Sequence, residues 1–258
     1  MRLMKRILSA AAVLALSASL LVGCSSGTAS SVPVSASSAA ESTVSSVEET
    51  ASSAVYENEA AAAQLLNALT GSYQELWPVI LADEYKQTWL DDCTALVGED
   101  NAEAAFEKLS SMVTSDVYGE DAVKAYANGG GAYFCGFTNS LAILTFDGET
   151  STISGTDKDG NVLFSHTYHY IGMEPVRGLY EFQSDDADSG EFTYFFLAPD
   201  TSAETYHIEF RYGSDAEALS QYDTGEYAYW LASGISTDCD QTMIDNCIEL
   251  FCTENLAG

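Results

Sequence analysis

The chain has little positive charge. Nine Lys and Arg stand against 39 Asp and Glu among 258 residues, for a formal net charge of −30 at pH 7. Three of the nine cations, Arg2, Lys5 and Arg6, lie at the extreme N-terminus, so the remainder is more acidic still. Binding to nucleic acid or to anionic lipid depends on Lys and Arg that neutralise phosphates. The composition therefore excludes a nucleic-acid partner and direct adhesion to lipid headgroups, and it favours cations, which the protein's field would concentrate.

Local signatures of catalysis are missing as well. The chain contains no Gly-x-Ser-x-Gly nucleophile elbow, no glycine-rich phosphate-binding loop and no His-Glu-x-x-His pair. Histidine occurs only three times, and no local pattern joins it to a cysteine nucleophile. We therefore expect a binding protein and not an enzyme.

The N-terminus has the order of parts of a bacterial lipoprotein signal. After the positive start comes an apolar stretch from Ile7 to Leu20, followed by Leu21-Val22-Gly23-Cys24. The apolar stretch is shorter than the roughly 20 residues that a transmembrane helix needs. We expect cleavage before Cys24, lipidation of its thiol and anchoring by two acyl chains on the outer face of the cell membrane. The alternative is an ordinary signal peptide with an incidental cysteine.

The segment after Cys24 has the composition of a tether. Residues 25–54 are almost wholly Ser, Ala, Thr, Val and Glu, and the first aromatic residue is Tyr56. Such a segment cannot bury enough apolar surface to offset the entropy lost on ordering. The sequence thus predicts a signal peptide at 1–23, a lipidated cysteine with a disordered tether at 24–55, and a folded domain at 56–258.

An odd number of cysteines remains for the folded domain. Disulfides are permitted outside the cytoplasm, but an odd number leaves at least one thiol unpaired. None has the close paired spacing of a zinc knuckle. We expect one or two disulfides or buried apolar thiols, with the pairing left open among Cys93, Cys135, Cys239, Cys247 and Cys252.

The folded region divides into a helical first part and a strand-rich second part. Apolar spacing predicts a helix over 57–69, a continuing apolar stripe from Tyr73 to Tyr85, and helices over 101–113 and 120–127. Beyond these, short aromatic and β-branched runs alternate with turn signals such as Asp147-Gly148. Strands are expected at 132–137, 141–146, 162–171, 178–182, 192–197 and 205–212, and a last helix at 239–251. This order predicts an α+β fold with N-terminal helices, an antiparallel barrel-like sheet and a C-terminal helix.

Five segments of the chain share one resemblance. They are LTGSYQELW at 69–77, HTYHYIG at 166–172, RGLYEF at 177–182, the acidic DADSGEF at 186–192 and YHIEF at 206–210. In this order they resemble segments of the ZinT (YodA-like) family of extracytoplasmic zinc-binding proteins. The likeness covers about 69–251, with a longer insert near 147–161, and it implies a calycin-like, lipocalin-type barrel with flanking helices.

The resemblance also implies a zinc site of three histidines, two of them in a His-x-His. Alternate residues of a strand point to one side, so His-x-His aims both imidazoles into one cavity. Here Thr205 stands at the first position and His207 at the second. The upstream histidine falls at Phe195 or, with a shortened loop, at Asp200. The family's metal site is therefore degenerate in this chain.

The residues themselves suggest a mixed site in its place. Thr205, His207 and Glu209 share one strand face, and Asp200 lies just before the strand. One imidazole with carboxylates can hold Zn²⁺ or another divalent cation such as Mn²⁺ or Ca²⁺. In the alternative, His207 is a hydrogen-bonded histidine that lines the barrel.

Three other features are weaker candidates. His166 and His169 are three apart on an expected strand and face opposite sides, so at most one can join the metal site. The acidic turn at 185–190 offers several oxygens to Ca²⁺ but lacks the spacing of an EF-hand, and a solvated hairpin turn is the alternative. The 15 tyrosines either line a small-molecule pocket or fill the barrel.

Together these observations predict a lipid-anchored, extracytoplasmic protein that binds zinc or another divalent cation and assists a metal-uptake transporter. The competing expectation is a metal-free surface module of lipocalin-like fold that binds a small ligand or a protein partner.

Overall fold

The computed structural model describes residues 58–198 and 207–257. All of them belong to one compact unit, Glu48–Gly258. The expected signal, Cys24 and the tether lie outside the described residues, and so do Asp200 and Thr205. Within the described ranges, no helix is both long and apolar enough to cross a membrane.

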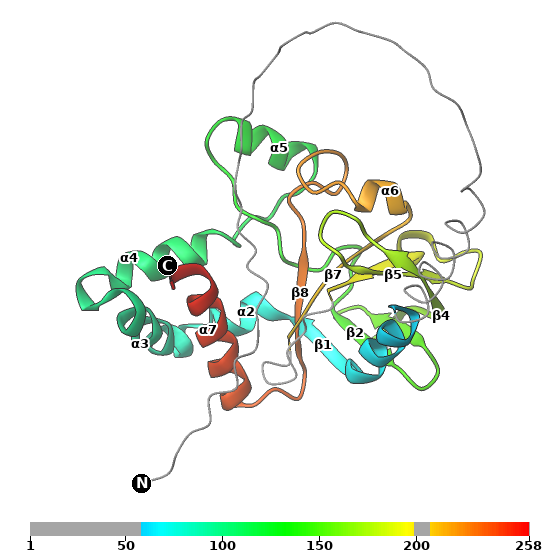
Figure 1. Ribbon diagram of the computed structural model, residues 1–258, viewed down its shortest axis with the longest axis horizontal. Helices are drawn as coiled ribbons and strands as arrows, with labels where there is room; N and C mark the ends of the chain where they lie inside the picture. Colours follow the sequence, from blue (N-terminus) through cyan, green and yellow to red (C-terminus); the bar gives the residue numbers. More distant parts are fainter. Residues whose placement is uncertain (1–57, 199–206, 258) are drawn as a thin grey trace, which may run out of the picture. The chain divides into compact units, whose positions relative to one another are not determined.

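Eight antiparallel strands close into a barrel (Figure 1). Each strand pairs with its neighbours in the sequence, and β1 pairs with β8 to complete the ring. The expected α+β class, with helices, an antiparallel barrel and a C-terminal helix, is confirmed. The strands are β1 (Gly71–Glu75), β2 (Ile143–Asp147), β3 (Thr152–Thr156), β4 (Val162–Met173), β5 (Tyr180–Ser184), β6 (Tyr194–Leu197), β7 (His207–Gly213) and β8 (Ala232–Ser236).

Most helices lie between β1 and β2 or after β8. Residues 58–68 are helical, as expected, but Tyr73 belongs to β1, so the apolar stripe that follows this helix is not wholly helical. The last helix continues five residues beyond its expected end at Phe251. The helices are α2 (Leu76–Ile80), α3 (Lys86–Val97), α4 (Glu99–Ser111), α5 (Glu120–Ala127), α6 (Ala216–Leu219) and α7 (Gln241–Leu256), with 3-10 turns η1 (Asp83–Tyr85) and η2 (Gly190–Phe192).

The expectation of a strand at 132–137 is wrong. In that segment Phe134 makes isolated bridges to Thr114 and Trp230, and no ladder forms. Strands β3 and β8 were not expected, and β3 lies inside the stretch interpreted as an insert. Both consist mainly of small residues, Thr-Ile-Ser-Gly-Thr and Ala-Ser-Gly-Ile-Ser, whose hydrophobic alternation is faint.

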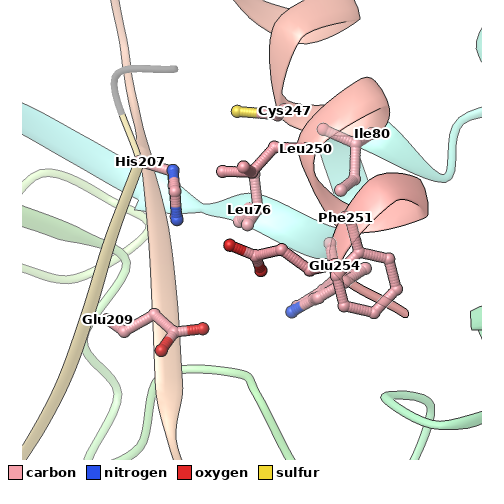
Figure 2. A pocket seen from close by; sticks show the side chains of 9 residues that line it. Leu76, Ile80, His207, Glu209, Cys247, Leu250, Phe251 and Glu254 are labelled. Carbon is pink, nitrogen blue, oxygen red and sulfur yellow. The ribbon is translucent and has the colours of Figure 1, made fainter. Parts of the chain in front are cut away.

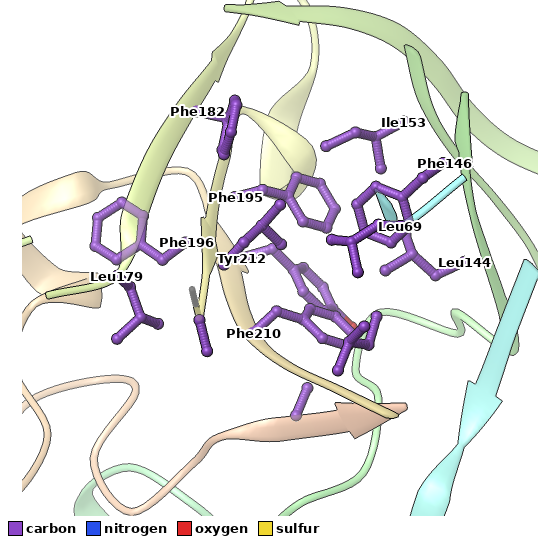
Figure 3. Packing of buried hydrophobic residues seen from close by; sticks show 14 of the residues in the cluster. Leu69, Leu144, Phe146, Ile153, Leu179, Phe182, Phe195, Phe196, Phe210 and Tyr212 are labelled. Atoms are coloured by element: carbon purple, nitrogen blue, oxygen red, sulfur yellow. The ribbon is translucent and has the colours of Figure 1, made fainter. Parts of the chain in front are cut away.

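The barrel interior is filled by apolar side chains, about half of them aromatic (Figure 3). The ring centroids of Phe195 and Tyr212 lie 5.3 Å apart, and those of Phe137 and Phe210 also lie 5.3 Å apart. These spacings are those of packed aromatic pairs. In this part of the barrel the aromatic residues therefore form the core. This agrees with one of the two expectations for the tyrosines, namely that they fill the barrel.

A second apolar cluster, which we call the helical cluster, lies outside the barrel. It is built by α2, α3, α4 and α7, with fully buried Trp89 and Ile248 among its members. The indole Nε1 of Trp89 donates a hydrogen bond of 2.7 Å to the carbonyl of Ile80. Ile235 of β8 also belongs to this cluster. One wall of the barrel thus carries the helices on its outer side, and Figure 1 shows α7 running beside α3.

A buried arginine fastens the segment after β7 to the barrel. The guanidinium of Arg211 donates hydrogen bonds to the carbonyls of Leu219, Gln221 and Tyr227. Its central carbon lies 4.4 Å from the ring centroid of Tyr222. Burial lowers the pKa of Arg211 to about 10, so the group keeps its charge at neutral pH. Arg211 therefore orders residues 219–227 by hydrogen bonds that an apolar side chain cannot make.

Replacing Arg211 with Met should lower the free energy of unfolding by about 3–5 kcal/mol, because three carbonyls lose their donor and a buried ring loses its cation. Lys158→Met removes a cation at an exposed turn, where its ammonium lies 3.6 Å from Asp159, and should change stability by less than about 0.5 kcal/mol. Urea unfolding of both variants measures the difference. Equal effects of the two substitutions would contradict the assigned role.

Candidate metal-binding cavity

The two faces of β7 have opposite surroundings. Ile208 and Phe210 are buried in the barrel core at 1% and 0% exposure. His207 and Glu209 alternate with them and so lie on the other face. Across the ladder His207 pairs with Ile235, and directly paired residues share a face. Since Ile235 belongs to the helical cluster, His207 points out of the barrel towards the helices and does not line its interior.

A small cavity of about 40 Å³ lies between β7 and the helices. His207 and Glu209 contribute its polar atoms from β7, and Cys247 and Glu254 contribute theirs from α7 (Figure 2). This volume suits an ion with a few waters and is far below the 300–1,000 Å³ or so of typical small-molecule pockets. The remaining lining is apolar apart from the indole N–H of Trp77: Leu76, Trp77, Ile80, Leu250 and Phe251.

One face of α7 supplies the second side of the cavity. Cys247, Leu250, Phe251 and Glu254 follow one another at spacings that keep them on one side of a helix. The helix is capped at its start by Asp240, whose carboxylate accepts a hydrogen bond of 3.0 Å from the amide of Met243. Figure 2 shows the side chain of Glu254 extending from α7 so that its carboxylate points towards the His207 ring.

Sequence reasoning missed Glu254 because it ended the last helix at Phe251. The signal was present: Ile248, Cys252 and Leu256 repeat every four residues, which continues the helix by another turn. For Cys247 the sequence predicts only a disulfide or a buried thiol. Its place in the cavity depends on how α7 packs against β7, which no local pattern predicts.

A second thiol near Glu209 is held in its neutral form. Burial, with a smaller contribution from the charge of Glu209, raises the pKa of Cys135 to about 12. Cys135 is not among the residues that line the cavity, and its raised pKa favours the thiol over the thiolate that binds metal. The donors that remain at the cavity are one imidazole, two carboxylates and the thiol of Cys247.

The structure describes two of the four predicted ligands. His207 and Glu209 share a face and a cavity, as the alternation predicts. Asp200 and Thr205 lie outside the described residues. Within 58–198 and 207–257, no three side chains of His, Cys, Asp or Glu form a group that could hold a metal ion. The types of donor fit zinc, and the assignment of His207 and Glu209 as ligands stays a prediction.

His166 and His169 lie on β4 and are not among the residues that line this cavity. His166 pairs across the ladder with Ile153 of the barrel core, and its side chain is 16% exposed against 53% for His169. The two histidines therefore have different surroundings, as expected for residues on opposite faces of a strand. Nδ1 of His166 lies 2.7 Å from Oδ2 of Asp186, and Nδ1 of His169 lies 2.6 Å from Oδ1 of Asp185.

The acidic turn that these histidines contact connects β5 and β6, which pair with each other as a hairpin. Ser184 and Ser189 hold it from inside: the two hydroxyls lie 2.7 Å apart, and the amide of Asp186 donates to the Ser184 hydroxyl at 3.1 Å. Its first two carboxylates are engaged by the imidazoles. The contacts describe a hairpin turn tied to the neighbouring strand.

Comparisons with known proteins give one kind of match. No protein-family model matches the chain, and no curated protein matches its sequence significantly. Among solved structures, the Zn(II)-bound ZinT-like domain of AdcA from Streptococcus pneumoniae is similar, with 15% sequence identity and a TM-score of 0.45, over 71% of this chain and 89% of that domain. Zn(II)-bound AdcA from the same organism matches with 14% identity and a TM-score of 0.42, over 72% of this chain and 35% of AdcA. This chain therefore spans about a third of the length of that second structure.

Replacing both His166 and His169 with Gln should loosen the acidic turn without unfolding the barrel. We expect faster amide hydrogen exchange across 185–190 and a loss of less than about 1 kcal/mol of stability per pair, because such partly exposed pairs contribute little to global stability. Hydrogen-exchange mass spectrometry resolves the local effect, and Lys158→Gln at another turn serves as the control. Unchanged exchange across 185–190 would show that the imidazoles do not hold the turn.

Proposed function

We propose that this chain is an extracytoplasmic protein that binds a divalent metal ion, zinc first, in the cavity beside β7. The observation that carries the proposal is the placement of His207 and Glu209 in one cavity with Cys247 and Glu254 of α7. Imidazole nitrogen, carboxylate oxygen and thiolate sulfur are the three kinds of ligand that zinc takes in proteins. The size of the cavity suits an ion better than an organic ligand.

Two further features support the same proposal. In the sequence, Thr205 stands two positions and Asp200 seven positions before His207, and we infer that they complete the ligand set. The net charge of −30 attracts divalent cations at long range. Such attraction does not select one metal; selection among them follows from the nitrogen and sulfur donors, which favour zinc over calcium.

The test is calorimetric titration of the chain lacking residues 1–23 with Zn²⁺, Mn²⁺ and Ca²⁺. We expect zinc to bind with a dissociation constant below tens of micromolar and His207→Ala to weaken binding at least tenfold, which is about 1.4 kcal/mol. Glu209→Gln and Glu254→Gln should each weaken it less, because one carboxylate of several is removed. Low pH should reduce affinity in all of them, since ligands must be deprotonated.

His169→Ala is the matched control, since His169 is a half-exposed histidine outside the cavity. Binding that is lost in His169→Ala and kept in His207→Ala would move the site to the acidic turn. Absence of zinc binding tighter than tens of micromolar would leave the metal-free surface module, with a small ligand or a protein as its partner, as the function to pursue.

We further propose that Cys24 is lipidated and holds the domain at the outer face of the cell membrane, where it supplies metal to an uptake transporter. The order of positive start, apolar stretch, Gly23 and Cys24 supports the anchor. The transporter follows from the family resemblance. A domain held at the membrane by a lipid anchor can collect ions at the membrane surface without itself crossing the bilayer.

Cys24→Ser should abolish incorporation of labelled palmitate and release the protein from the membrane fraction into the soluble extracytoplasmic fraction. Two acyl chains provide stable anchoring, and their loss leaves an acidic chain with no affinity for anionic lipid. Cys239→Ser, which changes a partly exposed cysteine of the domain, is the control and should remain in the membrane fraction. Continued incorporation of palmitate into Cys24→Ser would refute the lipid anchor at this residue.

A further inference from the structure

Two buried cysteines from distant parts of the chain meet in the helical cluster. Cys93 lies on α3 and Cys252 on α7, and both are 0% exposed. Their sulfur atoms lie 3.9 Å apart, although 159 positions separate the residues in the sequence. The structure records both as thiols. The sequence left the pairing open, and the packing of α3 against α7 brings this pair together.

We propose that Cys93 and Cys252 form a disulfide that links α3 to α7. The oxidant is a small-molecule disulfide or a thiol–disulfide oxidoreductase. The thiolate of one cysteine attacks the oxidant's disulfide and releases one reduced thiol. The thiolate of the second cysteine then attacks the mixed disulfide that this step leaves and releases the second reduced thiol of the oxidant. In total, two protein thiols are oxidised and one external disulfide is reduced to two thiols. The sulfurs approach by about 2 Å to reach bonding distance.

The surroundings of the pair determine when this bond forms. Burial raises the pKa of the Cys93 thiol and, more strongly, that of the Cys252 thiol. Thiolates are the reactive species, so the folded, reduced protein exchanges slowly. Oxidation is therefore faster while the chain folds, before the helical cluster closes. An oxidising compartment outside the cytoplasm would supply the oxidant at that stage.

The bond would fix one wall of the candidate cavity. Cys252 follows Phe251 directly and precedes Glu254 by two residues, and both of these line the cavity. Linking α7 to α3 therefore limits the movement of the helix that carries Cys247 and Glu254. The inference does not depend on metal binding, because the two sulfurs belong to the packing behind the cavity.

The experiment uses the chain lacking residues 1–23 and carrying Cys24→Ser, which has five thiols. It is refolded in a mixture of oxidised and reduced glutathione, and its free thiols are counted after denaturation. We expect three free thiols, a Cys93–Cys252 peptide in a non-reduced digest, and a fall in Tm of about 5–15 °C on adding reductant. Oxidation of the already folded, reduced protein should be at least tenfold slower.

Cys93→Ser and Cys252→Ser should each keep four free thiols after the same treatment, with a Tm that does not respond to reductant. Cys135→Ser, which also alters a buried cysteine, should still lose two thiols. Five free thiols after refolding, or a digest that pairs Cys93 or Cys252 with another cysteine, would overturn the proposal. Metal titration of the same samples is scored separately, so a failure of the proposed function is distinguishable from a failure of the disulfide.

Discussion

Closure of the barrel leaves β7 no freedom of register, and the candidate cavity depends on that constraint. Ile208, Phe210 and Tyr212 are at most 1% exposed and fill the interior. A slip of one residue would turn these three side chains outward and bring His207 and Glu209 into an apolar core. The cost of burying such groups among aromatic rings is far larger than any gain from altered pairing. Packing inside the barrel thus orients the polar residues outside it.

The helical cluster covers the outer wall of the barrel, as the core cluster fills its interior. β8 consists of small residues apart from Ile235, which belongs to the helical cluster on the outer side. Such a strand contributes little apolar area, so α7 and α2 cover this wall, with the ring centroids of Trp77 and Phe251 at 4.6 Å. The cavity forms where this cover meets the polar end of β7. It is a product of tertiary packing.

The sequence supports prediction where one segment carries its own pattern. The aromatic runs of β4 and β7 and the periodic stripe of α7 predict their elements, and alternation alone places His207 and Glu209 on one face. The same reasoning fails for β1, β3 and β8, whose small or polar residues form strands because neighbouring strands pair with them. It also fails for Glu254 and for the meeting of Cys93 with Cys252. Those contacts depend on how α7 docks, which only long-range packing determines.

Three cations of the described residues have partners away from the cavity, and this bears on what the cavity attracts. The ammonium groups of Lys86 and Lys124 lie 3.0 Å from carboxylate oxygens of Glu103 and Asp121 at the surface. Arg211 donates hydrogen bonds to backbone carbonyls of the segment after β7. Most carboxylates must therefore be balanced by ions from solution. A diffuse negative field concentrates cations according to their charge and not their identity, so it would supply divalent ions to the proposed site without selecting one metal from another. In the proposed site, selection of zinc would rest on the imidazole of His207 and the thiol of Cys247, because nitrogen and sulfur donors favour zinc in a way that carboxylates alone do not.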